Sequence, residues 1–523
     1  MDAGSWSARW PLLLLGAWLG CLAVYRLWVG QTGQLYWPDE YRYLHALHVL
    51  DELRKGDLRE ALHWIFGVEA GVASRPSYIL LSLLPAVGQG VANIVFDLPP
   101  THPSFYTIPV IFNVMVSVAL AMTIYALLDL VVEDHWLAAG GAALHGMLAN
   151  TNLYVRHLFP YDLSLLLFLL SLVVLLGRSE GRHLTSGCCL IAGILTGAAA
   201  TTYPGYNLFV LIPMGVLAAA RPFAWRPMAT FIVTAFGVVA FWEAIARVGG
   251  YSFIGASKRF STTFTPETLT GVQGAYDEGF RFLPLYLIEV EGLAGILLAL
   301  LLVVFLVLAI WGRFERLVIA IVGTALVAYL VYAIAVQVLH WVVFYGRLVH
   351  MYLPFVVLAA TLVMRELKNP SLRYGATAIL LVAVFASFAP TAVSAMAIRF
   401  PKDVERILAG GAGQSWKICK AGQPAGGREA PLNGCDVVLV NAQHLYPLPE
   451  QWKSSAPAGF SLAGQFAHPM QFRPYWFEGY TPQERARLQA DPPMINVFSR
   501  SGRLFSWAVD AVSKLGLRWA AAT

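Results

Sequence analysis

The sequence predicts an all-α polytopic membrane protein with a small α/β domain after the last membrane segment. Of the 523 residues, 58% are hydrophobic and only 13% are charged, whereas soluble domains have roughly 25% charged residues. The mean hydropathy is +0.61. Apolar segments about as long as a bilayer is thick recur up to residue 397, after which the composition becomes polar. So much apolar surface requires lipid as a solvent.

Twelve apolar segments are candidates for spanning helices, which need about 20 residues each. They lie at 11–29, 76–96, 104–128, 136–153, 161–177, 185–201, 204–220, 227–247, 283–312, 315–338, 344–364 and 374–397. The first is too long and too aromatic for the core of a signal peptide, so we expect an uncleaved anchor. We expect a membrane module at 1–398, with the outer loop and its interfacial helices at 30–96, and a C-terminal domain at 399–523.

The distribution of Lys and Arg orients these segments, because basic residues in short loops favour the cytoplasmic side. From residue 178 onward alternate loops are basic, which is what a consistent topology requires. The basic residues are Arg178, Arg182, Arg221, Arg226, Arg313, Arg316, Arg365, Lys368 and Arg373. With these loops in the cytoplasm, the C-terminal domain is extracytoplasmic. The Ala-, Gly- and Arg-rich composition is typical of bacteria, so we expect the cell inner membrane.

One early segment does not fit a full crossing. Loops 30–75 and 154–160 both face outside in this scheme, yet three apolar segments lie between them. Segment 76–96 contains an internal proline and two glycines, so it is the poorest continuous helix of the three. We expect it to lie along the outer face or dip into it. That leaves eleven crossings and puts the acidic loop 129–135 in the cytoplasm.

Acidic residues stand at the outer ends of two predicted helices. Residues 38–66 have an amphipathic pattern that is typical of helices in the membrane interface. They begin with Asp39 and Glu40 after a proline, and Asp162 follows a proline in the same way. A proline and an acid at a helix start are also a purely structural pattern. Because an acid near hydrocarbon is costly, we expect Asp39 and Asp162 to serve a site, with Glu40 secondary.

Basic residues accompany these acids on the outer side. They are Arg75, Arg156, His157, Arg347 and His350. A single arginine at the interface is most often an anchor that reaches toward the head groups, but several near two acids favour a polar site. The planar guanidinium fork is suited to gripping a phosphate or diphosphate.

These motifs resemble those of the GT-C class of membrane glycosyltransferases, and most of all the branch of protein O-mannosyltransferases and lipid A aminoarabinose transferases. The resemblance covers about residues 5–365. It rests on 36–43 (YWPDEYRY), 75–81 (RPSYILL), 154–162 (YVRHLFPYD) and 346–354 (GRLVHMYLP). Ser77 replaces the usual second proline of the second motif. Members of this class open with one helix and a large outer loop that carries an acidic motif, followed by a short apolar helix.

The resemblance implies an inverting transferase with a polyprenyl-phosphate sugar as donor and a lipid, glycan or protein hydroxyl as acceptor. A single displacement needs a base to take the proton of the acceptor hydroxyl, and we assign this role to Asp39. The developing phosphate charge must be stabilised. The candidates for that role are Arg75 and Arg347, followed by Arg156 and His350. Asp162 would orient the acceptor or the sugar, or hold an arginine.

Cofactors and covalent links stay open at this stage. Two acids in different loops could hold a divalent cation, although Arg75 and Arg347 could replace its charge, and no His or Cys spacing is typical of zinc. The net charge of +5, without a basic block, gives no reason to expect nucleic acid. Cys419 and Cys435 could pair in an oxidising compartment.

The C-terminal part contains two recognisable elements. Residues 436–440 (DVVLV) have the pattern of a buried strand. Residues 481–488 (TPQERARL) have the pattern of a capped helix. Together they predict a small α/β domain near the mouth of the site.

Other functions remain open. A secondary transporter would need polar or broken helices at mid-membrane, usually in two repeated halves, whereas no repeat is visible and segments 283–312 and 315–338 are nearly free of charge. A membrane scaffold or assembly protein would use the outer domain to bind a partner. Within the enzymes, a ligase could use a lipid-diphosphate oligosaccharide.

Overall fold

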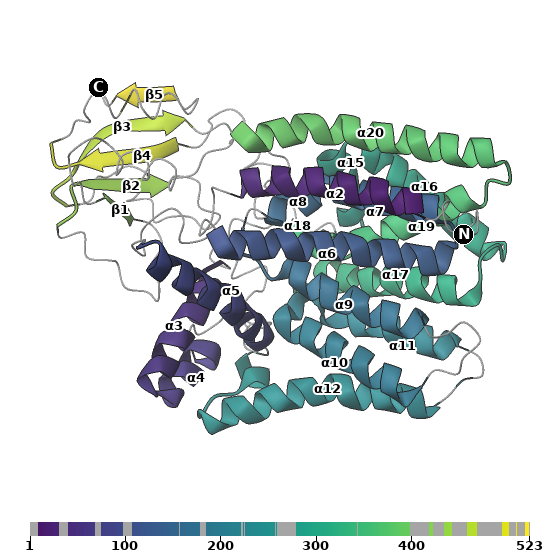
Figure 1. Cartoon of the computed structure of the whole chain (residues 1–523), viewed down its shortest axis with the longest axis horizontal. Helices are drawn as coiled ribbons and strands as arrows, with labels where there is room; N and C mark the ends of the chain where they lie inside the picture. The colour runs from purple at the N-terminus through teal and green to yellow at the C-terminus, as the bar shows by residue number, and fades with distance from the viewer. Residues whose placement is uncertain are drawn as a thin grey trace.

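The computed structural model shows a helical bundle with a small sheet at one end (Figure 1). It describes residues 9–30, 40–67, 75–97, 107–155, 157–177, 185–220, 223, 225–256, 258, 279–342, 344–397, 418–421, 434–441, 458–467, 494–501, 509 and 518–521. The first described helix, α2 (Arg9–Val29), begins at the end of the bundle that lies away from the sheet (Figure 1). The bundle therefore has two distinct ends.

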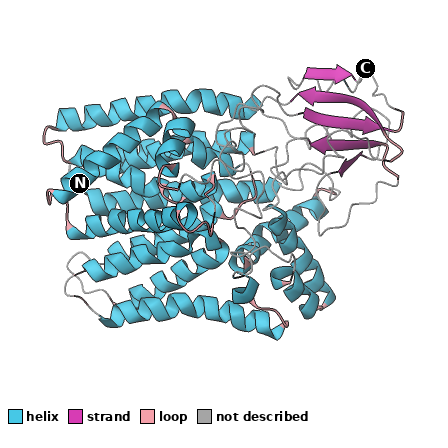
Figure 2. Ribbon diagram, turned by 180° about the vertical axis from the view of Figure 1, so that it is seen from behind, coloured by secondary structure: helices cyan, strands magenta, loops and turns pink. Residues whose placement is uncertain are grey.

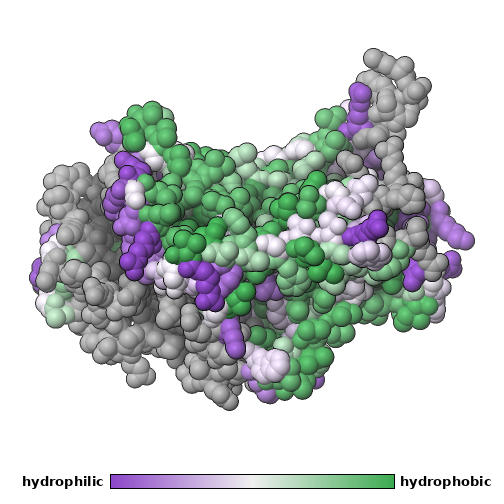
Figure 3. Space-filling view, turned by 90° about the horizontal axis from the view of Figure 1, so that it is seen from below, coloured by the Kyte–Doolittle hydropathy of each residue, from purple (hydrophilic) through white to green (hydrophobic). Residues whose placement is uncertain are grey.

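Seven helices of the described residues are long and apolar enough to cross a membrane. They are α2, α5 (Pro76–Val95), α6 (Thr107–Val132), α12 (Trp225–Val248), α16 (Leu293–Ile310), α17 (Arg316–Gln337) and α20 (Pro370–Ala397). Shorter apolar helices fill the bundle, including α9 (Tyr161–Leu176), α10 (Ser186–Thr202) and α19 (Leu353–Arg365). Figure 3 shows a broad apolar surface over the helices, with most hydrophilic residues toward the two ends. The protein is a multi-pass membrane protein.

All twelve predicted apolar segments fall on helices, but four of them are interrupted, which corrects the expectation of single continuous helices. The pairs are α7 (His135–Met147) with α8 (Ala149–Val155), η3 (Pro204–Val210) with α11 (Leu211–Ala219), α15 (Phe282–Glu291) with α16, and α18 (Gly346–His350) with α19. Leu148 has extended backbone between α7 and α8. Gly292 separates α15 from α16 with φ 61° and ψ −132°, a conformation that is essentially restricted to glycine.

Helix α5 corresponds to the segment that we expected to lie at the outer face. It runs obliquely at the end of the bundle nearest the sheet, together with α3 (Tyr41–Lys55) and α4 (Leu58–Phe66) (Figures 1 and 2). One face of α5 packs on α3, α6 and α10. The other face is exposed and apolar, with Leu80, Leu84, Val87, Val91 and Ile94. This exposed apolar face is suited to contact with lipid.

The strands form one mixed sheet in the order β1-β2-β4-β3-β5. They are β1 (Ile418–Ala421), β2 (Val437–Asn441), β3 (Ser461–Ala467), β4 (Met494–Ser499) and β5 (Arg518–Ala521). Strand β2 confirms the predicted strand, pairing in parallel with β1 and antiparallel to β4, with Val438 opposite Phe498. The helix predicted at 481–488 lies outside the described residues. Cys435 is disulfide-bonded, while the side chain of Cys419 lies outside the described part.

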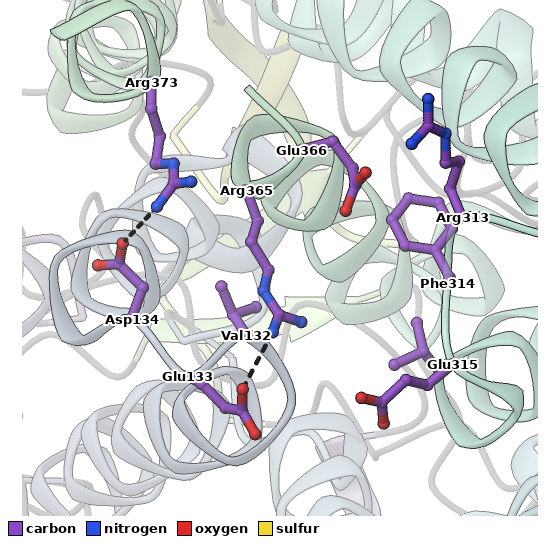
Figure 4. Close-up of a pocket in the computed structure, with 10 residues that line it drawn as sticks. Val132, Glu133, Asp134, Arg313, Phe314, Glu315, Arg365, Glu366 and Arg373 are labelled. Atoms are coloured by element: carbon purple, nitrogen blue, oxygen red, sulfur yellow. Dashed lines mark hydrogen bonds and ion pairs between the residues drawn. The ribbon is translucent and has the colours of Figure 1, made fainter. Parts of the chain in front are cut away.

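Charged loops meet at the end of the bundle opposite the sheet (Figure 4). Arg365 contacts Glu133 at 3.0 Å, and Arg373 contacts Asp134 at 3.4 Å. Together with Arg313 these residues line a cavity of about 300 Å³. The acidic loop that follows α6 therefore lies beside basic loop residues at the same end of the bundle. Its acidic residues are paired with these basic residues, so they are compatible with the same side of the membrane.

Candidate active site

Most of the predicted outer residues that the structure describes gather where α5, α9 and α18 begin. Asp39 and Arg156 lie outside the described residues. The two arginines of the described set, Arg75 and Arg347, and the carboxylate of Asp162 come from segments more than 80 residues apart in the sequence. The fold therefore brings three of the predicted site residues together.

Glu40 fastens the first outer loop to the turn before α9. Its side chain is fully buried. One carboxylate oxygen accepts a hydrogen bond from the backbone N–H of Leu158 at 2.7 Å, and the other lies 3.1 Å from Nδ1 of His157. Tyr78 of α5 donates a hydrogen bond to the Leu158 carbonyl at 2.6 Å. The loop, α5 and the turn that leads to Asp162 are thus tied together.

Two tyrosines lie between the two arginines. The guanidinium carbon of Arg75 is 4.8 Å from the ring centroid of Tyr203. The rings of Tyr203 and Tyr161 meet edge to face at 4.7 Å. Arg347 donates to the Tyr161 hydroxyl at 3.1 Å and lies over the Tyr345 ring at 4.2 Å. The two positive groups are therefore connected through one aromatic pair, and guanidinium groups are suited to binding an anionic ligand.

Asp162 lies in the first turn of α9, next to Tyr161, and its side chain is 11% exposed. One carboxylate oxygen is 2.7 Å from Nε2 of His350, whose side chain is fully buried. The ring of Tyr154 packs edge to face against His350 at 5.1 Å. The Asp162 side chain therefore contacts His350 through one carboxylate oxygen and keeps a small exposed area.

Polar side chains at the helix breaks support this group. The carboxylate of Glu291, the last residue of α15, accepts hydrogen bonds from the backbone N–H groups of Ala149 and Asn150, at 2.7 and 3.0 Å. These bonds satisfy donors at the start of α8. The Asn150 side chain in turn donates to the Gly346 carbonyl of α18 at 3.2 Å. Three of the four helix breaks are thus linked through Asn150.

Arg26 of α2 forms hydrogen bonds with residues on both sides of the break between α7 and α8. It is buried in α2 and donates to Asn152, Ser117 and the carbonyl of Gly146, at 3.0, 2.9 and 3.1 Å. Sequence reasoning missed Arg26, Asn150 and Glu291. The signal that could have indicated them was present, because each is a polar residue inside an otherwise apolar segment.

An apolar cavity of about 360 Å³ lies between α10, η3 and α12. Its walls include Phe168, Thr201, Tyr206, Phe236 and Val239. The Tyr206 hydroxyl donates to the Arg347 carbonyl at 3.3 Å, and Thr201 pairs at 2.7 Å with Ser77, two residues after Arg75. The polar group and the apolar cavity therefore share a boundary.

Among the described residues, no group of three His, Cys, Asp or Glu side chains is arranged to hold a metal ion. Asp39, which we considered as a ligand together with Asp162, is not among those residues. Glu40 already accepts two hydrogen bonds, so the described acids do not form a carboxylate pair.

Comparison with solved structures identifies the architecture. The crystal structure of ArnT from Cupriavidus metallidurans bound to undecaprenyl phosphate matches with a TM-score of 0.54 at 12% identity, over 97% of this chain and 100% of that chain. The fold is that of ArnT. The apo structure of the same ArnT matches with a TM-score of 0.50 at 13% identity, over 95% and 99% of the two chains. The expected GT-C, ArnT-like fold is therefore confirmed.

A weaker likeness is to the Archaeoglobus fulgidus oligosaccharyltransferase tethered with an acceptor peptide, with a TM-score of 0.46 at 9% identity, over 87% of this chain and 73% of that chain. No family model and no curated protein matches the sequence.

Proposed function

We propose that this protein is an inverting glycosyltransferase that moves a sugar from a polyprenyl-phosphate donor to an acceptor hydroxyl at the outer face of the cytoplasmic membrane. The observation that carries the proposal is the arrangement of Arg75 and Arg347 about Tyr161 and Tyr203, beside Asp162 and next to an apolar cavity. A lipid phosphate has this combination of an anionic head and an apolar tail. ArnT, whose fold this chain shares, was solved with undecaprenyl phosphate bound.

Each polar group then has a chemical role. The guanidinium groups of Arg75 and Arg347 bind the phosphate and stabilise the charge that develops on it as its bond to the sugar breaks. Asp39 is the base that removes the proton of the acceptor hydroxyl. Its neighbour Glu40 is bonded to Leu158, four residues before Asp162, which supports a position for Asp39 near the site. Asp162 orients a hydroxyl of the acceptor or the sugar.

Glu40 and Arg156 have smaller parts in this proposal. Glu40 positions the first outer loop, because both of its carboxylate oxygens are engaged within the protein. Arg156 remains a further candidate for the phosphate, on the strength of its place in the motif at 154–162.

We also propose that the site and the C-terminal sheet lie outside the cytoplasmic membrane. The sheet lies at the end of the bundle where α3, α4 and α5 lie (Figure 1). The disulfide at Cys435 supports an oxidising compartment. The arginines of the opposite end, Arg313, Arg365 and Arg373, fit the cytoplasmic side.

Transfer from a panel of polyprenyl-phosphate sugars, with membranes that contain the full chain, tests the function. We expect wild-type transfer from one donor, and loss of transfer in Asp39→Asn and Arg347→Ala. Arg313→Ala is the matched control, because it removes an arginine at the opposite end of the bundle. The proposal fails if Asp39→Asn transfers sugar at the wild-type rate.

Interrupted helices also occur in secondary transporters, and the structure shows four of them where we expected continuous helices. The same Asp39→Asn variant separates the two functions, because transport of a solute across vesicles would tolerate this change, whereas sugar transfer would be lost.

A further inference from the structure

Ser77 connects three helices through one chain of hydrogen bonds. The indole N–H of Trp242 in α12 can only donate, and it donates to the Ser77 hydroxyl oxygen at 3.0 Å. In α10, the Thr201 hydroxyl donates its one proton to the Gly197 carbonyl at 2.8 Å. The Thr201 oxygen then accepts from the Ser77 hydroxyl, which is 2.7 Å away. This direction gives each donor of the chain an acceptor.

The three side chains of this chain are buried. Ser77 is 6% exposed, Thr201 is 1% exposed and Trp242 is 7% exposed. Inside a membrane bundle no bulk water replaces a lost hydrogen-bond partner. Movement of the start of α5 away from α10 and α12 would therefore leave buried donors and acceptors unpaired, which is costly.

Helices α10 and α12 form a fixed frame for this chain, because two glycines of α10 let the backbones approach closely. A Cβ at Gly193 would lie 2.8 Å from the carbonyl oxygen of Phe231. A Cβ at Gly197 would lie 2.6 Å from the carbonyl oxygen of Ala235. Small residues at such contacts are typical of tightly packed membrane helices. The two ends of the hydrogen-bond chain are therefore held at a set separation.

Arg75 lies at the same end of α5 as Ser77. The Arg75 carbonyl accepts a hydrogen bond from the backbone N–H of Ile79, so the backbone of Arg75 belongs to the first turn of the helix. Its guanidinium group lies over Tyr203, which is two residues after Thr201. The contacts of residue 75 with 203 and of residue 77 with 201 therefore join the same two segments.

We propose that Ser77 is a positioning residue for Arg75, which fastens the first turn of α5 to α10 and α12 so that the guanidinium stays over Tyr203. This inference rests on the proposed function. Ser77 stands where the second motif usually has a second proline, and a proline has no hydroxyl to make these bonds. Because Thr201 and Gly197 also line the apolar cavity, the chain links the position of Arg75 to the cavity wall.

The first test measures the affinity of the full-length protein in detergent for undecaprenyl phosphate in four proteins. They are the wild type, Ser77→Ala, Arg75→Ala and the double variant. We expect Ser77→Ala to raise the dissociation constant about threefold to tenfold. In the Arg75→Ala background the same substitution should have no further effect, because the group that Ser77 positions is absent. Multiplying losses, or wild-type affinity of Ser77→Ala, would overturn the inference.

A pair of variants of equal shape separates the hydroxyl from packing. Threonine and valine at position 77 fill the same volume, but only threonine keeps a hydroxyl. We expect Ser77→Thr to bind undecaprenyl phosphate more tightly than Ser77→Val. Equal affinities of these two variants would show that the hydroxyl plays no part.

Hydrogen exchange gives a readout that does not depend on ligand. The amide of Ile79 is bonded to the Arg75 carbonyl, so its exchange reports how firmly the first turn of α5 is held. Exchange in a peptide that contains Ile79 should be faster in Ser77→Ala than in the wild type. Thr230→Val is the matched control, because its hydroxyl bonds the Arg226 carbonyl within its own helix, and it should exchange like the wild type.

The two measurements separate the two proposals. A wild type that binds no undecaprenyl phosphate would count against the proposed function. Wild-type exchange of the Ile79 peptide in Ser77→Ala would instead count against the role of Ser77, whatever the ligand is.

Discussion

The backbone N–H of Leu158 donates a hydrogen bond to the carboxylate of Glu40 at 2.7 Å, across 118 residues of sequence. Both groups are buried. This single bond fixes the place of the first outer loop against the turn that leads into α9, and it gives Glu40 a structural role although Glu40 belongs to an acidic motif.

Glu40→Ala should therefore lower stability. It leaves the Leu158 N–H buried without an acceptor, which costs about 1–3 kcal/mol of the free energy of unfolding. Unfolding in mixed micelles measures the loss. Glu52→Ala is the control in the same loop, because the partner of Glu52 is the exposed Lys55, and such surface pairs contribute about 0–1 kcal/mol. Equal losses in the two variants would contradict the assignment.

Tyr161→Phe should weaken the binding of undecaprenyl phosphate without unfolding the protein. The substitution removes the hydroxyl that accepts from Arg347 and leaves the ring contact with Tyr203 in place. A hydrogen bond to a charged group contributes roughly 1.5–3 kcal/mol, so the dissociation constant should rise about tenfold or more. Tyr345→Phe keeps the ring over which Arg347 lies, and it should bind like the wild type.

Gly295→Ala should disrupt the junction of α15 and α16. A Cβ at this position would lie 1.7 Å from the carbonyl oxygen of Leu287, which is backbone and cannot move aside. We expect a large loss of folded protein, measured by size-exclusion chromatography and thermal unfolding. Gly16→Ala in α2 is the control, because nothing lies within 4 Å of its Cβ position. Normal yield and melting temperature for Gly295→Ala would show that the two helices do not approach so closely.

At the end of the bundle opposite the sheet, Asp134→Ala should cost more stability than Glu133→Ala. Asp134 accepts from the backbone N–H groups of Trp136 and Leu137 at the start of α7, and it also contacts Arg373. Removing such a cap costs about 0.5–2 kcal/mol. Glu133 is 63% exposed and forms only a surface pair with Arg365, for which about 0–1 kcal/mol is expected. The reverse order of the two losses would exclude this account of the loop.

Sugar transfer should persist in EDTA. Arg75 and Arg347 provide two fixed positive charges at the proposed phosphate, and these supply the stabilisation that a divalent cation would otherwise give. The measurement compares transfer rates with EDTA and with added Mg²⁺ or Mn²⁺. A loss in EDTA that added metal restores would instead indicate a cation held by Asp39 and Asp162.

Much of the fold could be predicted because lipid imposes a simple pattern on the sequence. Apolar segments of bilayer length predicted the apolar helices of the described part, the amphipathic pattern at 38–66 predicted α3 and α4, and three of the predicted basic loop residues, Arg313, Arg365 and Arg373, lie together at one end. The interruptions could not be predicted in this way, because Leu148 and Met351 are apolar and leave the hydropathy pattern unbroken. Gly292 and Pro354, which lies in the first turn of α19, gave local signals, but glycine and proline within an apolar segment are common in membrane helices.

The site was predictable in part. The order of the acidic and basic motifs indicated Arg75, Asp162 and Arg347 as site residues. In the structure, Arg75 and Arg347 are connected through Tyr203 and Tyr161, and Asp162 follows Tyr161 in α9. The partners of Glu40 and His350 were not predictable, because Leu158 and Asn150 are distant from them in sequence. The position of Asp39, which lies outside the described residues, stays a prediction.

The interrupted helices restrict how such a protein can change over evolution. Peptide groups released at a break must find partners inside the protein, because hydrocarbon supplies none, and here Glu291 and Arg26 are among the side chains that supply them. Glu291 also bonds the backbone of Asn150, whose side chain meets His350, so a substitution at Glu291 disturbs both folding in the membrane and the residues next to Asp162. We therefore expect related sequences to vary less at these helix breaks than in the loops between helices.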